Sequence, residues 1–191
     1  MIFDRRAAMK TLLADRPKNL FVVPGLGSCT WDTFAAGDDD RNFYLWGAMG
    51  GAAMIGLGLA LAKPNIRVAV VTGDGEMLMG MGSLATIAVQ KPKNLAVVVF
   101  DNGHYGETGM QASHTQGGVD LVSVAKSCGF DRVFDVADDA GLKELAGLLS
   151  SHDGTLFARV PIAADDPPRA LPEKDGVVIK DRVRRAAAAI D

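Results

Sequence analysis

Two short polar segments of this sequence place oxygen-bearing side chains directly after apolar runs. Gly73-Asp74-Gly75 follows the run at residues 68–72, and Asp101-Asn102-Gly103 follows the run at residues 95–100. Consecutive parallel strands end at one edge of an α/β sheet, which is where such sheets bind ligands. Hard oxygen ligands suit Mg²⁺, and glycines permit tight turns and close backbone approach. We therefore expect Asp74 and Asn102 to converge on one site, with Asp74 suited to magnesium.

The position of these segments depends on an alternation of short apolar runs with longer helical patterns. Continuous apolar runs that end at turn residues predict buried strands, at residues 20–23, 43–45, 68–71, 95–100, 133–134 and 155–160. Longer segments between them predict helices, at residues 48–62, 83–90, 119–127 and 138–150. This alternation predicts an α/β fold with a doubly wound, mostly parallel sheet and helices on both faces.

Length and composition indicate one domain. The chain has 191 residues, of which 48% are hydrophobic and 23% are charged. This suffices for one sizeable core and not for two nucleotide-type domains. We expect the domain to occupy residues 1–165 and to be followed, at residues 166–191, by a linker and a basic, alanine-rich helix over about 180–190. A net charge of −3 without a basic stripe argues against nucleic acid as a partner.

The cysteines and the apolar segments bear on compartment. Cys29 and Cys128 lie far apart and in no metal-type spacing, which is typical of a reducing compartment. No stretch reaches the about 18 uninterrupted apolar residues of a membrane span, and the N-terminus lacks the pattern of a secretory signal. We therefore expect a cytoplasmic protein that does not associate with membranes.

The GDG segment and its interval to Asn102 resemble the cofactor motif of thiamine-diphosphate enzymes. The interval is long enough for one helix and one strand, so both ends fall at the carboxyl edge of neighbouring strands. The resemblance implies a thiamine-diphosphate-binding fold. It also implies that Asp74 and Asn102 donate side-chain oxygens to Mg²⁺, that His104 donates its backbone carbonyl, and that the metal bridges the cofactor's diphosphate.

A second stretch, residues 47–51, is similar to the segment of these enzymes that bends the cofactor into a V shape. The resemblance implies that Met49 wedges between the two cofactor rings. It further implies that the Gly47 carbonyl and the Met49 amide contact the aminopyrimidine. Outside this family, a methionine before an alanine- and glycine-rich helix is an ordinary filler of apolar gaps.

The diphosphate is expected to contact two glycine-rich turns. One is the loop at residues 25–30, and the other is the GDG turn, because backbone amides at the start of a helix attract phosphate. The residues assigned to this role are Gly25, Gly27, Ser28, Thr30, Gly73 and Gly75. Glu76 departs from the family pattern, in which a small residue follows the motif, and a carboxylate there is expected to point away or toward a lysine or arginine.

Further segments are similar to the sulfopyruvate and phosphonopyruvate decarboxylases within this family, over about residues 20–160. These are residues 82–87, 92–95, 101–109, Gln111 and His114-Thr115. The resemblance adds Tyr105, Gly106, Glu107 and Thr108 to the expected cofactor-binding residues. The imidazoles of His104 and His114 are the candidate catalytic side chains facing substrate, although histidines on exposed loops are also common without a catalytic role.

The resemblance implies a partner chain. Formation of the reactive cofactor needs a carboxylate on the aminopyrimidine, and in thiamine enzymes that glutamate lies on a pyrimidine-binding domain for which this chain has no room. We therefore expect an α-type subunit that supplies the glutamate in an α/β hetero-oligomer, with this chain as the β-type subunit. The expected reaction is decarboxylation of a sulfopyruvate- or phosphonopyruvate-like 2-oxo acid to an aldehyde and CO₂.

Three alternatives remain at the level of sequence. Residues 28–32 lack an arginine that a sulfonate or phosphonate tail would favour, so the acid is open. A split acetolactate-synthase-like carboligase would share every cofactor residue, and a non-catalytic cofactor-binding subunit would share the fold. A dinucleotide-binding oxidoreductase is disfavoured, because no GxGxxG follows the first predicted strand.

Overall fold

A parallel five-stranded sheet forms the centre of the molecule. The computed structural model describes residues 1–190. The strands of this sheet are β1 (Leu20–Pro24), β2 (Arg67–Gly73), β3 (Leu95–Asp101), β6 (Arg132–Asp135) and β7 (Leu156–Pro161). Their order is β1-β2-β3-β7-β6, and every neighbouring pair is parallel. The predicted doubly wound α/β fold is therefore confirmed, and the two ligand-bearing strands, β2 and β3, are neighbours.

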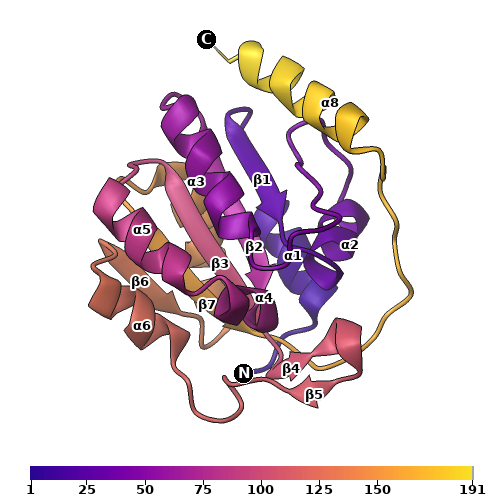
Figure 1. Ribbon diagram of the computed structural model, residues 1–191, viewed down its shortest axis with the longest axis vertical. Coiled ribbons are helices and arrows are strands. Elements are labelled where there is room, and N and C mark those ends of the chain that lie inside the picture. The colour runs from indigo at the N-terminus through magenta and orange to yellow at the C-terminus, as the bar shows by residue number, and fades with distance from the viewer. Residues whose placement is uncertain (191) are drawn as a thin grey trace.

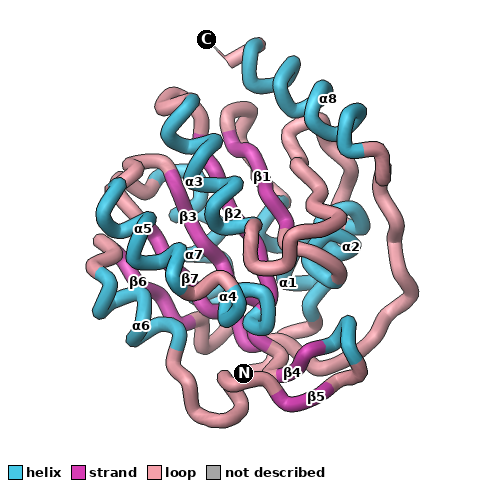
Figure 2. The backbone as a smooth tube through the Cα atoms, viewed as in Figure 1, coloured by secondary structure: helices cyan, strands magenta, loops and turns pink. Residues whose placement is uncertain are grey.

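Helices cover both faces of this sheet (Figures 1 and 2). They are α1 (Arg5–Leu13), α2 (Ser28–Ala35), α3 (Ala52–Ala62), α4 (Asp74–Met79), α5 (Gly82–Gln90), α6 (Leu121–Cys128), α7 (Asp139–Ser151) and α8 (Gly176–Ala188). One apolar cluster joins the sheet to α3, α5, α6 and α8, and a second joins the other face to α1, α2 and α7. A small hairpin, β4 (His104–Tyr105) and β5 (Gln111–Ala112), encloses a 3₁₀ turn, η1 (Gly106–Thr108).

The alternation of strand side chains explains the two clusters. In β2, Val68 and Val70 pack toward α3 and α5, whereas Ala69 and Val71 pack toward the opposite layer. Both faces of the sheet are thus buried, as is typical of parallel strands with continuous β-branched runs. Small residues let α3 approach closely, because a Cβ at Gly56 would lie 2.2 Å from Cγ2 of Val70.

Several predicted elements are wrong or were missed. Residues 43–45 form no strand, and the segment makes only an isolated bridge between Asn42 and Val22 before it diverges from the sheet. Helix α3 begins at Ala52 rather than at residue 48, because Ala48 has a positive φ of 57° that no helix accommodates. Helices α1, α2 and α4 were not predicted. The helical spacing of Ala8, Met9 and Leu12 in α1 was overlooked, and α4, at six residues, is too short to show a period.

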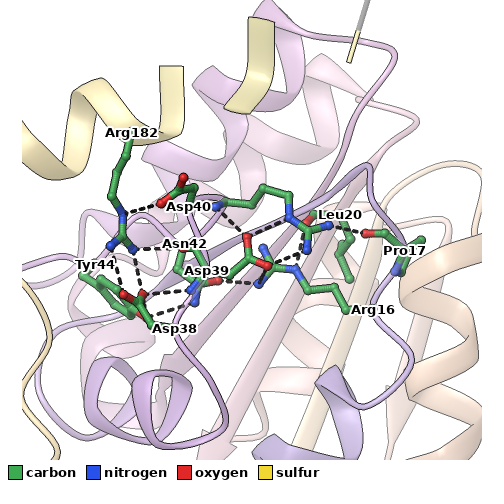
Figure 3. A network of polar contacts seen from close by, with 10 residues as sticks. Arg16, Pro17, Leu20, Asp38, Asp39, Asp40, Asn42, Tyr44 and Arg182 are labelled. Atoms are coloured by element: carbon green, nitrogen blue, oxygen red, sulfur yellow. Dashed lines mark hydrogen bonds and ion pairs between the residues drawn. The ribbon is translucent and has the colours of Figure 1, made fainter. Parts of the chain in front are cut away.

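The C-terminal helix packs back on the domain. Ile179, Val183 and Ala187 of α8 are buried, and the last two join the cluster around α3. Arg182 donates to both carboxylate oxygens of Asp38, at 3.0 and 2.8 Å, and this pair belongs to the polar network drawn in Figure 3. Helix α8 begins earlier than predicted, at Gly176. Of the helices in the described chain, none combines the length and the hydropathy that a membrane crossing requires.

Candidate functional site

A cavity of about 580 Å³, open to solvent, lies at the carboxyl edge of β1, β2 and β3. Ligand sites in open α/β sheets occur at this edge. Eleven of the residues predicted for the site line it: Ser28, Met49, Gly73, Asp74, Gly75, Asn102, His104, Tyr105, Gly106, Glu107 and Thr108. The structure therefore brings together the GDG turn, the turn that carries Met49 and the segment after β3.

The other predicted residues lie outside the cavity wall. Thr30 is buried, and its hydroxyl donates to the carbonyl of Gly25 at 2.9 Å, so it closes its own turn. Gly27 and Gly47 contribute turns beside the wall. His114 is exposed and contacts the wall only through Tyr105, whose hydroxyl is 2.8 Å from its Nδ1.

Asp74 is a buried carboxylate at the end of β2. Hydroxyl groups of Ser113 and Thr115 donate to its Oδ2, the second at 3.2 Å, and no lysine or arginine within residues 1–190 forms an ion pair with it. Burial raises its pKa, and the hydroxyl of Ser113 partly opposes that increase. A buried carboxylate without a basic partner is electrostatically suited to a cation.

The neighbouring carboxylate, Asp101, is in the opposite situation. Arg159 donates to its Oδ2 at 3.2 Å, and Thr115 donates to its Oδ1 at 2.8 Å. Asp101 thus has a basic partner, which it shares with Asp135. The single hydroxyl proton of Thr115 can serve only one carboxylate at a time, and the shorter contact is with Asp101; its oxygen nevertheless lies between the ends of β2 and β3.

Asn102 and His104 form a compact turn after β3. The amide of His104 donates to Oδ1 of Asn102 at 2.9 Å, and Nδ1 of His104 lies 2.7 Å from the carbonyl of Asn102. Since a carbonyl can only accept, Nδ1 carries the proton and Nε2 is left as an acceptor in the neutral ring. The side chain of Asn102 keeps its oxygen at the cavity wall, where a second lone pair remains.

Open space at two glycines fits a ligand that approaches the backbone closely. A Cβ added at Gly73 or at Gly47 would meet no atom within 4 Å. Elsewhere the wall is tight, because a Cβ at Gly75 would lie 2.6 Å from the ring of Tyr105 and one at Gly27 would lie 2.5 Å from Glu107. The hairpin segment thus packs directly on the GDG turn and on the 25–28 loop. The donor set of this cradle, with backbone amides and oxygen ligands, fits a diphosphate with its magnesium ion.

The turn at residues 47–51 presents Met49 to the cavity. Ala48 has a φ of 57°, and the amide of Gly51 donates to its carbonyl at 2.8 Å. A non-glycine residue in the left-handed region carries backbone strain, which is concentrated at functional sites. The position of Met49 is therefore set by an unusual backbone rather than by helix geometry.

Of the two orientations predicted for Glu76, the one toward a lysine or arginine is wrong, since no ion pair of Glu76 forms within residues 1–190. Its carboxylate accepts from the amides of Leu26, Gly50 and Ala52 and from the hydroxyl of Thr72. Burial raises its pKa, and these hydrogen bonds oppose the increase. The carboxylate therefore lies inside the wall and braces it.

The sequence analysis missed two other polar groups in the wall, Cys29 and Asp32. Burial raises the pKa of the Cys29 thiol, and the nearby carboxylate of Asp32 raises it further, so the thiol stays protonated at neutral pH. Asp32 is 2.9 Å from Nε of Arg5 and 3.3 Å from Nε of Arg6. Only α1, which was not predicted, brings these arginines to Asp32.

Comparisons with known proteins identify the family of this chain. The family model described as "Thiamine pyrophosphate enzyme, C-terminal TPP binding domain" matches residues 27–160, so the chain belongs to that family. The cofactor expected from the GDG motif, thiamine diphosphate, is thereby the one that the family binds.

Individual relatives give more detail. The chain is 41% identical over 162 residues to sulfopyruvate decarboxylase subunit beta of Methanothermobacter thermautotrophicus, covering 85% of this chain and 83% of that one. It is 42% identical over 159 residues to phosphonopyruvate decarboxylase of Streptomyces hygroscopicus, covering 83% of this chain and 39% of that protein. The solved structure of benzoylformate decarboxylase from Polynucleobacter necessarius shares the fold, with a TM-score of 0.68, 24% identity, and coverage of 85% of this chain and 34% of that one. The chain thus spans well under half of the latter two proteins.

Proposed function

We propose that this chain is the β-type subunit of a thiamine-diphosphate- and Mg²⁺-dependent 2-oxo acid decarboxylase. The observation that carries the proposal is the unpaired, buried carboxylate of Asp74 beside Asn102 and the open glycine Gly73, in a cavity that Met49 also lines. The relatives named sulfopyruvate and phosphonopyruvate decarboxylase support the reaction class.

In this proposal the residues of the chain hold the metal and the diphosphate. Asp74, Asn102 and the backbone carbonyl of His104 supply oxygen ligands to Mg²⁺, and Ser113 and Thr115 orient the Asp74 carboxylate through Oδ2. Met49 supports the bent cofactor from its strained turn. When bound, thiamine diphosphate supplies the carbanion that attacks a 2-oxo acid and the electron sink that accepts the electrons of the departing CO₂.

A partner completes the site in this proposal. The residues that line the cavity include Glu76, Glu107, Asp32 and Asp74, but Glu76 is fully engaged with backbone amides and Asp32 with arginines. An α-type chain is proposed to supply the glutamate that activates the aminopyrimidine. The name "subunit beta" of the relative that this chain matches over most of its length supports a two-chain assembly.

The proposed substrate is a small 2-oxo acid with an anionic tail such as sulfonate or phosphonate. Arg5 donates to the hydroxyl of Ser28 at 3.2 Å, and Arg5 and Arg6 both contact the carboxylate of Asp32. We propose that the cation for the tail comes from the partner. We propose that the imidazole of His104, which lines the cavity and whose Nδ1 faces the Asn102 carbonyl, exchanges a proton with substrate through Nε2.

The test is isothermal titration of the purified chain with thiamine diphosphate, with and without Mg²⁺, and again together with the chain encoded beside it. Tight binding that needs both Mg²⁺ and the neighbour supports the proposal, and absence of binding in every combination refutes it. Product analysis of the complex with sulfopyruvate, phosphonopyruvate and pyruvate then distinguishes decarboxylation to an aldehyde from carboligation. A complex that binds cofactor but turns over no 2-oxo acid would favour a non-catalytic subunit.

A further inference from the structure

The carboxylate of Glu76 connects three separate segments of the cavity wall. Its Oε2 accepts from the amide of Leu26 at 3.0 Å and from the hydroxyl of Thr72 at 2.8 Å. Its Oε1 accepts from the amides of Gly50 and Ala52 at 3.3 and 3.4 Å. Glu76 is only 4% exposed, so water does not compete for these bonds. One side chain thus holds the loop after β1, the end of β2 and the turn that carries Met49.

All four of these donors are neutral. No lysine or arginine in the described residues forms an ion pair with Glu76. A buried charge of this kind is costly and persists only where every acceptor site is satisfied. Glu76 is therefore held by neutral hydrogen-bond donors and not by an ion pair. A side chain that only filled apolar space would not need these four hydrogen bonds.

Glu76 also replaces a missing helix cap. The N-cap residue of α3, Gly51, has no side chain and makes no capping bond, so the first amides of α3 need an outside acceptor. The carboxylate of Glu76 meets that need from α4 and places negative charge where the helix dipole favours it. The amide of Ala52 is the first of α3, and the amide of Gly50 lies in the turn that carries Met49, so one oxygen of Glu76 contacts both the helix start and the turn.

The backbone around Glu76 is fitted to its carboxylate. A Cβ added at Gly25 would lie 1.9 Å from Oε2 of Glu76. The loop after β1 can therefore approach the carboxylate only because residue 25 is glycine. On the other side, Ala48 is held at a φ of 57°, a conformation that persists only where surrounding contacts fix it.

We propose that Glu76 is a positioning residue that fixes the Met49 turn and the 25–28 loop in the arrangement that receives thiamine diphosphate. This inference rests on the proposed function for its ligand, whereas the bracing of the two segments stands on the ligand-free structure.

The variants Glu76→Gln and Glu76→Ala distinguish the hydrogen bonds made by the two oxygens of the carboxylate. A glutamine has one acceptor and one donor, so it can keep Gly50 and Ala52 while its amide group faces Thr72, whose hydroxyl can rotate to accept. Leu26 is then left without an acceptor. We expect about a 10-fold rise in the Kd for thiamine diphosphate with Mg²⁺ in Glu76→Gln and about 100-fold in Glu76→Ala, as one or several buried donors lose their partners.

The matched control is Asn94→Ala. The Asn94 side chain donates to the carbonyls of Ala60, Lys63 and Ile66. It therefore braces the C-terminal end of α3, at the edge of the sheet where β3 begins. This variant lowers the stability of α3 without touching the cavity. We expect its Kd for the cofactor to stay within about 3-fold of the wild type even where its thermal midpoint falls as far as that of the Glu76 variants.

Gly25→Ala provides a reciprocal test. In the wild-type background its Cβ collides with Oε2 of Glu76, so we expect the Kd to rise. Combined with Glu76→Ala, the same change meets no carboxylate and keeps only the milder contact with Oγ1 of Thr72, at 2.8 Å, so its added effect on the Kd should be smaller than in the wild type. Simple addition of the two effects would contradict the inference.

Amide hydrogen exchange of the ligand-free chain decides the bracing without any cofactor. We expect Glu76→Gln to lose protection at Leu26 and keep it at Gly50 and Ala52, Glu76→Ala to lose it at all three, and Asn94→Ala to keep it at all three. The inference would be overturned if both Glu76 variants kept wild-type protection and a wild-type Kd. It would also be overturned if Asn94→Ala weakened cofactor binding as much as the Glu76 variants do. If the wild-type chain binds no cofactor in any combination, the proposed function fails, and the exchange data still decide whether Glu76 holds the two segments.

Discussion

Two aspartates at neighbouring strand ends have different surroundings. Asp101 has a basic partner in Arg159, which it shares with Asp135, whereas the side-chain contacts of Asp74 are the hydroxyl groups of Ser113 and Thr115. The charge of Asp74 is thus left for a group from outside the chain. This contrast, and not the presence of an aspartate as such, singles out Asp74 as the candidate metal ligand.

Replacing Asp74 by asparagine tests this assignment. Asparagine keeps the volume and an acceptor for Ser113 but removes the charge, so we expect Mg²⁺-dependent affinity for thiamine diphosphate to fall at least about 100-fold, beyond the typical loss for an outer-shell change. Titration calorimetry measures it. Asp153→Asn, an exposed change at the other edge of the sheet, is the control and should bind as the wild type does. Undiminished binding by Asp74→Asn would reject Asp74 as a ligand.

At the scale of elements, helix α3 contains two glycines in different environments. Gly56 faces β2, where a Cβ would lie 2.2 Å from Val70, whereas a Cβ at Gly58 would meet nothing within 4 Å. The close approach of α3 to the sheet, which sets the start of the helix beside the cavity, therefore depends on Gly56 alone of this pair.

Alanine substitution at the two positions should have opposite effects. We expect Gly56→Ala to lower the free energy of unfolding by about 1–3 kcal/mol through overpacking against Val70. Gly58→Ala should raise it by about 0.5–1 kcal/mol, because alanine has the higher helix propensity on an exposed face. Urea denaturation of both variants measures the difference, and equal effects would contradict the close packing of α3.

At the scale of the whole molecule, a polar network ties the C-terminal helix to the segment that leads to the Met49 turn (Figure 3). Arg182 of α8 bonds Asp38, and the hydroxyl of Tyr44 donates to the same carboxylate at 2.8 Å. Asn42 connects Tyr44 to Arg16, whose Nη1 lies 2.6 Å from the Asn42 side-chain oxygen. The segment that was predicted as a strand is thus held by side chains from both ends of the chain.

This network makes stability depend on pH through Asp39. Partial burial alone would raise its pKa, but hydrogen bonds from Arg41 and the charge of Arg16 outweigh burial and lower the pKa to about 2. A folded-state pKa below the unfolded value stabilises the fold above about pH 4, and this contribution is lost as pH falls from about 4 to about 2. Because the site is partly exposed, we expect it to contribute about 1 kcal/mol.

The comparison of wild type with Asp39→Asn isolates that contribution. At pH 6 the variant should unfold about 1 kcal/mol more easily, and the gap should close near pH 2, when the wild-type carboxylate is protonated. Denaturant unfolding at several pH values measures it, with Asp153→Asn as the neutral comparison. A gap that is constant with pH would show that the difference comes from packing and not from charge.

The amino-acid sequence by itself determined the five strands of the central sheet, most helices and the place of the site at the sheet edge. Residues 68–71 and 95–100 are apolar throughout, which fixes them as buried parallel strands, and the polar residues that follow them had to meet at one edge. Local chemistry also set helix starts, as where the Asp138 side chain accepts from the amide of Gly141 to cap α7. These features follow from near neighbours in the chain, so they are legible in the sequence.

The tertiary structure alone decided how the cavity wall is braced. Glu76 meets Leu26, Gly50 and Ala52, and Asp74 meets Ser113 and Thr115, across long stretches of chain that no local pattern relates. Tyr44 lies in a short apolar run that predicted a strand, yet its hydroxyl donates to Asp38 and accepts from the side chain of Asn42. Which group bonds a buried polar side chain depends on how distant segments pack. The hydrogen-bond partner is therefore known only from the folded structure.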